Sequence, residues 1–174
     1  FHIAGFPVSV PLGGILGVLL IAYLWTPNFS EPGRSGITLA VVFAVLLYAG
    51  VLVHELAHAW AARAFGYPVH GITLWLLGGY TVYERRSSRP WPELVIAVIG
   101  PVSTLLLAAG CWVLAANTGG SVSLLFGALA WTNGLLGVLN LLPGAPLDGG
   151  GVVKSLVWRI SGSESAGAKA AGYA

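Results

Sequence analysis

Charged residues are what this sequence lacks most. They fill 8% of its 174 positions, against about one quarter in an ordinary soluble domain. Apolar residues fill 56%, and the mean hydropathy is +0.84. A chain of this composition argues against a soluble globular protein. It predicts a multi-pass membrane protein that has the lipid bilayer as its solvent and first partner.

The small numbers of charged, cysteine and methionine residues exclude several classes of function and structure. Eight basic and six acidic residues are too few and too scattered for the basic stripe that nucleic-acid binding requires, so we expect no nucleic-acid partner. Cys111 is the sole cysteine, which excludes an internal disulfide and a thiolate cluster for a metal. Methionine is absent, and SGSESAGAKAAGYA ends the sequence without a terminating helix. We therefore expect residues 1–174 to be a single membrane-embedded domain, truncated at its C-terminus, with further transmembrane helices missing.

Long apolar runs dominate what is present. A membrane span needs about 20 mostly apolar residues, and four segments qualify: 6–25, 37–65, 94–116 and 121–142. A partial fifth begins after Gly151. Residues 69–92 differ, because they are rich in Thr, Tyr, Val and Trp, are interrupted by Gly78 and Gly79, and then turn basic. The predicted fold is an all-α multi-pass membrane protein of at least four transmembrane helices plus a partial fifth, with a short membrane-associated β-hairpin between the second and third.

The distribution of basic residues predicts the orientation, because short loops that carry Lys and Arg stay in the cytoplasm. With four spans, one side holds only Arg34. The other side holds Arg63, Arg85, Arg86, Arg89, Lys154 and Arg159. The hairpin loop and the region after Asp148 are therefore predicted to be cytoplasmic. Residues 54–58 then lie in the cytoplasmic half of the second span of a cell-membrane protein.

The motif HELAH at residues 54–58 carries the chemistry. His54 and His58 are one helical turn apart on the same face, so both imidazoles can reach one metal ion. Glu55 is turned by about 100° from His54 and can take a proton from an attacking water. Zinc suits histidine nitrogen and carboxylate oxygen. Charged residues in an apolar span cost about 2.5 to 3.5 kcal/mol each on insertion scales, which argues against a purely structural role.

Two histidines leave the site one protein ligand short. Asp148 is the candidate, since Pro143 and Pro146 break the fourth span just before it. The alternative is a solvated aspartate past the membrane edge, and spacing along the chain does not decide between them. Asn133 and Asn140 share a helix face; Asn140 can hydrogen-bond a substrate backbone or a developing oxyanion. Alternatively, both asparagines bond only neighbouring helices.

Four motifs in order resemble those of the site-2 proteases, which are intramembrane zinc metalloproteases, and in particular their compact bacterial and archaeal branch. They are HELAH at 54–58, LGG at 77–79, PELVIAVIGP at 92–101 and NLLPGAPLDGG at 140–150. Together they cover most of the chain from residue 45 to residue 150. Their combination is far more specific than any one of them.

The resemblance implies a ligand set and a class of substrate. His54, His58 and Asp148 would bind one zinc ion per subunit, with Glu55 as the catalytic base. The substrate would be a transmembrane protein such as an anti-sigma factor or a tethered regulator, cut in regulated intramembrane proteolysis. Relatives usually have six spans, and some add CBS modules after them. Gly151 departs from the pattern, because relatives often carry arginine there.

A helical substrate must unwind before its peptide bonds can be attacked. We expect a strand at 72–76 or 81–83 to pair with the unwound segment by β-addition. Gly78, Gly79 and Asn140 are the predicted substrate-binding residues. The alternative is a hairpin that only plugs the membrane interface.

Competing functions remain open from sequence alone. In a metal transporter or sensor, Glu55 would be a fourth metal ligand instead of a base. A catalytically inactive binding protein is disfavoured, because every expected catalytic position is filled. Gly13 and Gly17 form a GxxxG pattern that fits either oligomerisation or close packing within one chain, so the oligomeric state is left open.

Overall fold

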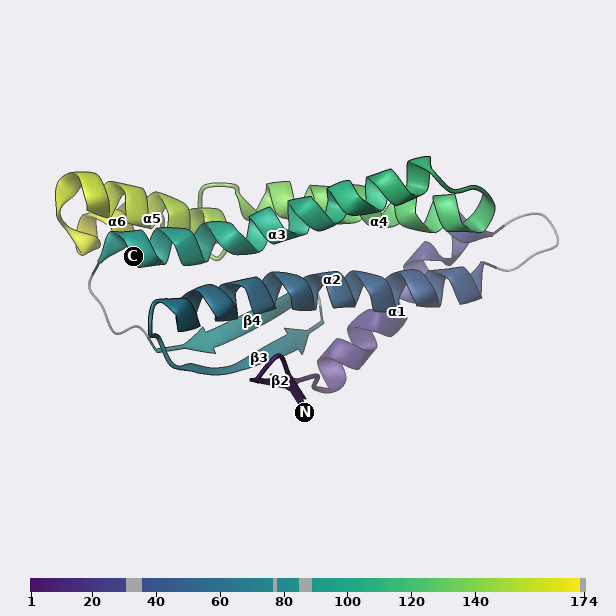
Figure 1. Ribbon diagram of the computed structural model, residues 1–174, viewed down its shortest axis with the longest axis horizontal. Helices are drawn as coiled ribbons and strands as arrows, with labels where there is room; N and C mark the ends of the chain where they lie inside the picture. Colours follow the sequence, from purple (N-terminus) through teal and green to yellow (C-terminus); the bar gives the residue numbers. More distant parts are fainter. Residues whose placement is uncertain (31–35, 77, 85–88, 173–174) are drawn as a thin grey trace.

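Four long apolar helices form the body of the protein. The computed structural model describes residues 1–30, 36–76, 78–84 and 89–172 (Figure 1). Within them lie α1 (Leu12–Phe29), α2 (Ile37–Ala64), α3 (Pro90–Ala116) and α4 (Gly120–Asn140). By length and composition, these four can cross a membrane. The predicted fold class is therefore confirmed.

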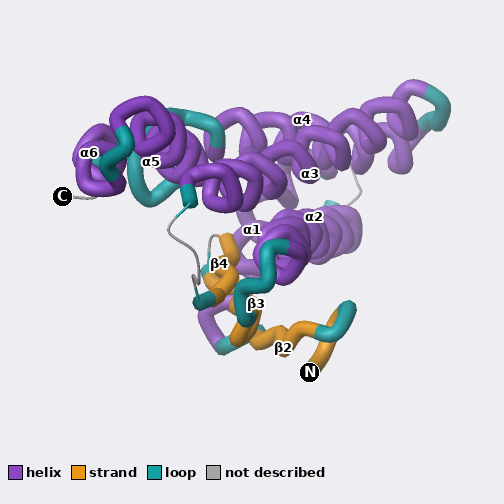
Figure 2. The backbone as a smooth tube through the Cα atoms, turned by 60° about the vertical axis from the view of Figure 1, so that its left-hand side comes forward, coloured by secondary structure: helices purple, strands orange, loops and turns teal. Residues whose placement is uncertain are grey.

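The helices are layered around α2. In Figures 1 and 2, α3 and α4 lie side by side on one side of α2, while α1 and a small sheet lie on the other. Two shorter helices follow α4: α5 (Asp148–Ser161) and α6 (Glu164–Ala170). At 14 residues, α5 is about 21 Å long, well short of the roughly 30 Å hydrocarbon core. The predicted partial fifth span is thus a short helix that begins at Asp148 rather than after Gly151.

The predicted start of the first span was wrong. Residues 6–9 form a strand, β2 (Phe6–Ser9), and α1 begins only at Leu12. Phe6 and Val8 are buried while Pro7 and Ser9 are exposed, so this segment alternates with a period of two. The continuous apolar run concealed that alternation. The other three predicted spans start and end within four residues of the observed helices.

The predicted hairpin is present but belongs to a larger sheet. β3 (Val69–Trp75) and β4 (Gly78–Tyr83) pair antiparallel, and β2 pairs parallel to the other side of β3. With β1 (His2–Ile3), the strand order is β1-β2-β3-β4. β2 covers the other edge of β3 at residues 72–73, and the Tyr48 hydroxyl donates to the carbonyls of Trp75 and Leu76. This contradicts the expectation that residues 72–76 could receive a substrate strand. In the described part of the sheet, β4 is the edge strand on the side away from β2.

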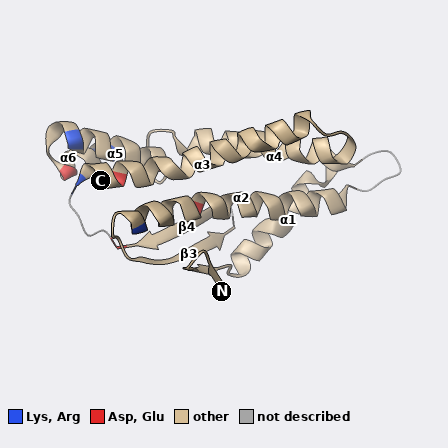
Figure 3. Ribbon diagram, viewed as in Figure 1, with Lys and Arg blue, Asp and Glu red and all other residues tan. Residues whose placement is uncertain are grey.

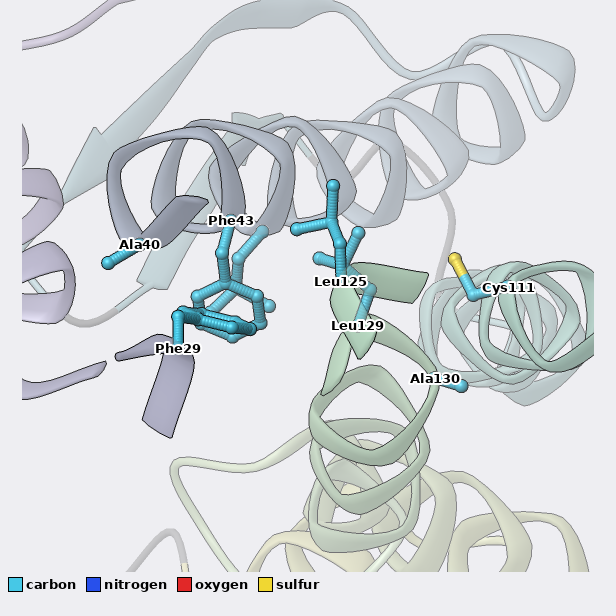
Figure 4. Packing of buried hydrophobic residues seen from close by; sticks show 8 residues of the cluster. Phe29, Ala40, Phe43, Cys111, Leu125, Leu129 and Ala130 are labelled. Atoms are coloured by element: carbon cyan, nitrogen blue, oxygen red, sulfur yellow. The ribbon is translucent and has the colours of Figure 1, made fainter. Parts of the chain in front are cut away.

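Two apolar clusters hold α2 in place. The first joins the four long helices and is drawn in Figure 4; it consists of Phe29, Ala40, Phe43, Leu47, Cys111, Leu125, Leu129 and Ala130. The second joins α2 to the sheet and consists of Phe6, Val8, Tyr48, Leu56, Ala59, Ile72 and Leu74. Large apolar side chains such as Leu106, Trp112 and Trp131 are exposed on the outer faces. An apolar exterior of this kind suits contact with lipid.

The GxxxG glycines pack α1 against the hairpin of the same chain. A side chain on Gly17 would overlap the Tyr48 hydroxyl and the Leu76 carbonyl, and Gly13 lies against the Trp75 ring. The Tyr48 hydroxyl donates to the Leu76 carbonyl at 2.6 Å. The pattern therefore serves packing within one chain.

Charged side chains gather at one end of the molecule. Figure 3 shows them mainly where α2 ends, α3 begins and α5 and α6 lie. Arg63, in the last turn of α2, donates to the Gly5 carbonyl at 2.9 Å and stacks on the Phe6 ring. Of the residues used to predict orientation, Arg34, Arg85 and Arg86 lie outside the described residues.

Candidate metal centre

Three ligand atoms from α2 and α5 converge on one point. The His54 and His58 Nε2 atoms are 3.0 Å apart. Asp148 Oδ2 lies 3.1 Å from His54 Nε2 and 3.3 Å from His58 Nε2. Both histidines are buried, and the Asp148 side chain is 25% exposed. This group could hold a metal ion, which favours the ligand interpretation of Asp148 over a solvated aspartate.

The donor set fits zinc. Nitrogen and oxygen ligands lie about 2.0 to 2.2 Å from zinc, which in a tetrahedron places them about 3.3 to 3.6 Å apart. The observed separations of 3.0 to 3.3 Å are close to that spacing. α3 approaches the histidines at Gly100, where a Cβ atom would overlap the His58 ring and reach 2.9 Å from His54 Cε1. Glycine at this position leaves the space that the two imidazoles fill.

Hydrogen bonds from α3 fix both imidazole tautomers. His58 Nδ1 lies 2.7 Å from the Ile96 carbonyl, which can only accept, so Nδ1 carries the proton. His54 Nδ1 lies 2.9 Å from the Thr104 hydroxyl, which itself donates to the Gly100 carbonyl. The hydroxyl oxygen therefore accepts from His54. In both rings Nε2 keeps its lone pair for a metal, because histidines that bind a metal usually donate their other ring N–H to a neighbouring oxygen.

Asp148 lies at the positive end of a helix. It is the first residue of α5, with Leu147 as the N-cap, so the irregular backbone predicted around it ends one residue earlier. The partial positive charge of the helix N-terminus favours the ionised carboxylate, the form in which Asp148 would bind a metal ion.

The glycines after Asp148 let α5 fit beneath the preceding loop. A Cβ atom on Gly149 would overlap the backbone carbonyls of Leu141 and Leu142. On Gly150, it would come 2.7 Å from the Gly144 carbonyl carbon. The two glycines after Asp148 are therefore required by the close approach of loop 141–147 to the first turn of α5.

Glu55 projects beside the ligands and is supported by β4. It is 5% exposed, and its Oε2 accepts a hydrogen bond from the Thr81 hydroxyl at 2.7 Å. Gly79 lies against the same side chain, since a Cβ atom there would come 2.8 Å from Glu55 Cγ. Thr81, Thr104 and Gly100 were not predicted as site residues. Hydroxyl groups in apolar segments, and the glycine before Pro101, are the signals that could have indicated them.

Two cavities meet at the site. The inner cavity, about 550 Å³, is lined by Gly50, Val51, His54, Glu55, Gly78, Gly79, Tyr80, Thr104, Asn133, Leu136, Leu139, Asn140, Pro146, Leu147 and Asp148. The outer cavity, about 340 Å³, is lined by Glu55, His58, Gly79, Tyr80, Thr81, Tyr83, Glu93, Ile96, Ala97, Pro146, Leu147, Asp148, Gly151, Lys154 and Ser155. Glu55 and Asp148 border both. The arrangement gives two approaches to one reacting centre.

The residues predicted to bind substrate all line the inner cavity. They are Gly78, Gly79 and Asn140, and their substrate-binding role stays a prediction. Asn133 lines the same cavity and donates its amide to the Leu129 carbonyl of its own helix at 2.8 Å.

Comparison with known proteins agrees with this geometry. The sequence model of Peptidase family M50 matches residues 42–123 and 115–173. The chain is 41% identical over 176 residues to a protein of Mycobacterium tuberculosis named zinc metalloprotease Rip3, covering 88% of this chain and 45% of that protein. It is 38% identical over 158 residues to one of Synechocystis named zinc metalloprotease sll0528, covering 88% and 41%. The chain therefore spans less than half the length of these relatives.

A solved structure shares the fold. The Site-2 Protease from Methanocaldococcus jannaschii superposes with a TM-score of 0.69 at 26% identity, covering 91% of this chain and 70% of that one. The likeness to site-2 proteases predicted from the motifs is thus confirmed. With zinc metalloproteases among its relatives and a histidine–aspartate site between apolar helices, the chain belongs to peptidase family M50.

Proposed function

We propose that this chain forms the catalytic domain of an intramembrane zinc protease that cuts a peptide bond within or near a transmembrane segment of its substrate. His54, His58 and Asp148 would hold one zinc ion per subunit. The observation that carries the proposal is the convergence of these three ligand atoms, 3.0 to 3.3 Å apart, beside the buried carboxylate of Glu55. The four span-length helices and the family membership support the membrane setting.

Glu55 is the proposed general base. When bound, zinc supplies a Lewis acid that polarises a carbonyl and brings the pKa of water to about 7. Glu55 accepts the proton of the attacking water and later delivers it to the leaving amine. The Thr81 hydroxyl holds one carboxylate oxygen, Oε2, in place. Asn140, which lines the inner cavity, is proposed to donate to the oxygen of the reacting carbonyl.

The outer edge of β4 is the proposed receptor for the unwound substrate. In the described part of the chain, β4 pairs with β3 alone, and its residues border both cavities. An extended peptide added to this edge would run past Glu55 and Asp148. Main-chain hydrogen bonds to β4 would replace those that the substrate loses on unwinding.

N-methyl groups on the substrate test this pairing without altering the enzyme. In an added strand, alternate N–H groups face the receptor edge. A panel of transmembrane peptides, each methylated at one backbone nitrogen near the cut, should therefore lose cleavage at every second position and keep it between. A uniform loss, or no loss, would contradict pairing with β4.

The substrate and the orientation are extensions of the same proposal. The charged end of the molecule lies where α2 ends and where α5 and α6 lie. Arg63 belongs to the last turn of α2, and Lys154 and Arg159 belong to α5, which suits the cytoplasmic side of the cell membrane. The metal centre would then lie in the cytoplasmic half of the bilayer. A membrane-tethered regulator or an anti-sigma factor would be cut so that its cytoplasmic part is released.

Zinc content and cleavage, measured together, test the activity. Protein reconstituted in lipid should contain about one zinc ion per chain and cleave a transmembrane model substrate. A chelator should abolish cleavage, and added zinc should restore it. His58→Ala should lose both zinc and cleavage, because only two ligands remain. Full cleavage by zinc-free protein would contradict the proposal.

A further inference from the structure

Resting on the proposed function, we infer that the outer cavity is a subsite for the substrate main chain on the charged side of the cut, and that the Ser155 hydroxyl is its hydrogen-bond partner. The cavity is bounded by α2, β4, α3 and α5. Ser155 lines the outer cavity but not the inner one.

Ser155 is buried without a partner. It is 1% exposed, and within the described part of the chain its Oγ has no hydrogen bond. Leaving a buried hydroxyl unsatisfied costs about 1 to 3 kcal/mol. Other helical hydroxyls in this chain donate to the carbonyl four residues earlier, as Thr104, Thr132 and Ser161 do. Ser155 makes no such bond to Gly151, so its hydroxyl has no partner in the described part of the chain.

The position of Ser155 predicts which part of the substrate it meets. Asp148, Gly151 and Ser155 follow one face of α5 and all line the outer cavity. Seven residues of helix correspond to about 10.5 Å. An extended peptide covers about 3.3 Å per residue. A substrate strand passing from the inner to the outer cavity would therefore reach Ser155 about three residues from the cut.

The lining explains why the ligand is main chain. Gly151 contributes no side chain between Asp148 and Ser155, and a Cβ atom there would come 3.1 Å from Ala97 Cβ, so this part of the cavity wall is narrow and favours a main chain over a bulky side chain. Lys154, also on the cavity wall, is bound to Glu164 by an ion pair of 3.0 Å. A serine hydroxyl can both donate and accept, and every extended peptide offers a carbonyl and an N–H group whatever its sequence.

A double-mutant cycle between enzyme and substrate tests the contact. Transmembrane peptides carrying a single amide-to-ester change, one position at a time on the charged side of the cut, are cleaved by lipid-reconstituted wild type and Ser155→Ala. Ser161→Ala is the matched control, since this serine lies on the same helix, is exposed and, in the described part of the chain, bonds only to nearby backbone.

Ser155→Ala should raise KM and lower kcat/KM by about tenfold, the value of one hydrogen bond, with zinc content unchanged. The ester at about the third position should weaken cleavage by wild type but add no further loss in Ser155→Ala. Equal cleavage by Ser155→Ala and wild type would overturn the inference. The inference would also be overturned if the ester change and Ser155→Ala lowered cleavage independently at every position. A Ser155 hydroxyl that only binds water would give that result. Failure of zinc-loaded wild type to cleave any peptide would contradict the proposed function itself.

Discussion

Gly78 and Gly79, adjacent in β4, leave very different amounts of space for a side chain. A Cβ atom on Gly79 would come 2.8 Å from Glu55 Cγ, whereas one on Gly78 would meet nothing within 4 Å. Gly79→Ala should therefore displace the Glu55 carboxylate. Cleavage should fall by about 100-fold, because small misplacements of a reacting group are costly. Zinc content should stay unchanged.

Gly78→Ala is the matched control for this prediction. It adds the same methyl group to the same strand without meeting Glu55, so cleavage should fall far less than in Gly79→Ala. Similar losses from the two alanines, measured as kcat/KM on one peptide, would mean that the glycines act on the substrate strand rather than on Glu55.

Thr104 should control metal affinity through His54. Thr104→Val keeps the shape of the side chain but removes the acceptor of the His54 Nδ1 proton. Loss of such a bond typically lowers metal affinity by 10- to 100-fold. Ser103→Ala is the control, because Ser103 donates to the same Gly100 carbonyl but, among the described residues, has no hydrogen bond to either histidine. Zinc competition with a chelator measures both, and equal affinities would contradict the assigned role.

Helical spacing made His54, Glu55 and His58 predictable, since residues four apart on a helix share a face. Asp148 needed the family resemblance, because nothing in its spacing brings α5 to α2. Thr81 and Thr104 were missed for a related reason. Each contacts the site only after β4 or α3 has packed against α2, and a threonine within an apolar segment has many structural uses.

At the scale of elements, α6 contacts both α5 and the loop that precedes Asp148. A Cβ atom on Gly167 would overlap the Lys154 carbonyl, so α6 packs closely on α5. The Ala145 N–H donates to the Ala171 carbonyl at 3.0 Å, which joins the end of α6 to this loop. α6 therefore helps to position the start of α5.

Gly167→Ala should weaken the packing of α6 on α5 and on loop 141–147. Hydrogen exchange should rise in residues 164–171 and in loop 141–147, and zinc should bind more weakly. Glu164→Gln is the contrast, since its partly exposed ion pair with Lys154 contributes little, about 0 to 1 kcal/mol. Faster exchange in α6 with an unaltered loop would show that α6 does not support Asp148.

Element lengths were predictable from hydropathy, but sheet membership was not. Three spans followed directly from apolar runs. β2 was hidden, because its four residues continue into the apolar run of α1. The pairing of β2 with β3 joins segments more than sixty residues apart, as in Val8 with Ile72, and no local pattern encodes it. That pairing leaves only β4 of the hairpin as a candidate receptor.

At the scale of the whole molecule, the charged end predicts the orientation. Ser165 in α6 and Thr118 between α3 and α4 are both exposed and lie toward opposite ends of the molecule (Figure 1). In a Cys111→Ala background, Ser165→Cys should react with a membrane-impermeant thiol reagent only from the cytoplasmic side. Thr118→Cys should react only from outside. The reverse pattern would contradict the orientation and the proposed direction of release.

The protease account depends most on Glu55. A metal transporter would use this carboxylate as a ligand, whereas a protease needs it as a base. The most direct measurement is therefore zinc content and cleavage of a transmembrane peptide by lipid-reconstituted Glu55→Gln beside wild type. The account predicts about one zinc ion per chain in both proteins, with cleavage by wild type alone. Cleavage by Glu55→Gln at the wild-type rate, or loss of its zinc, would contradict the assignment of Glu55 as the base.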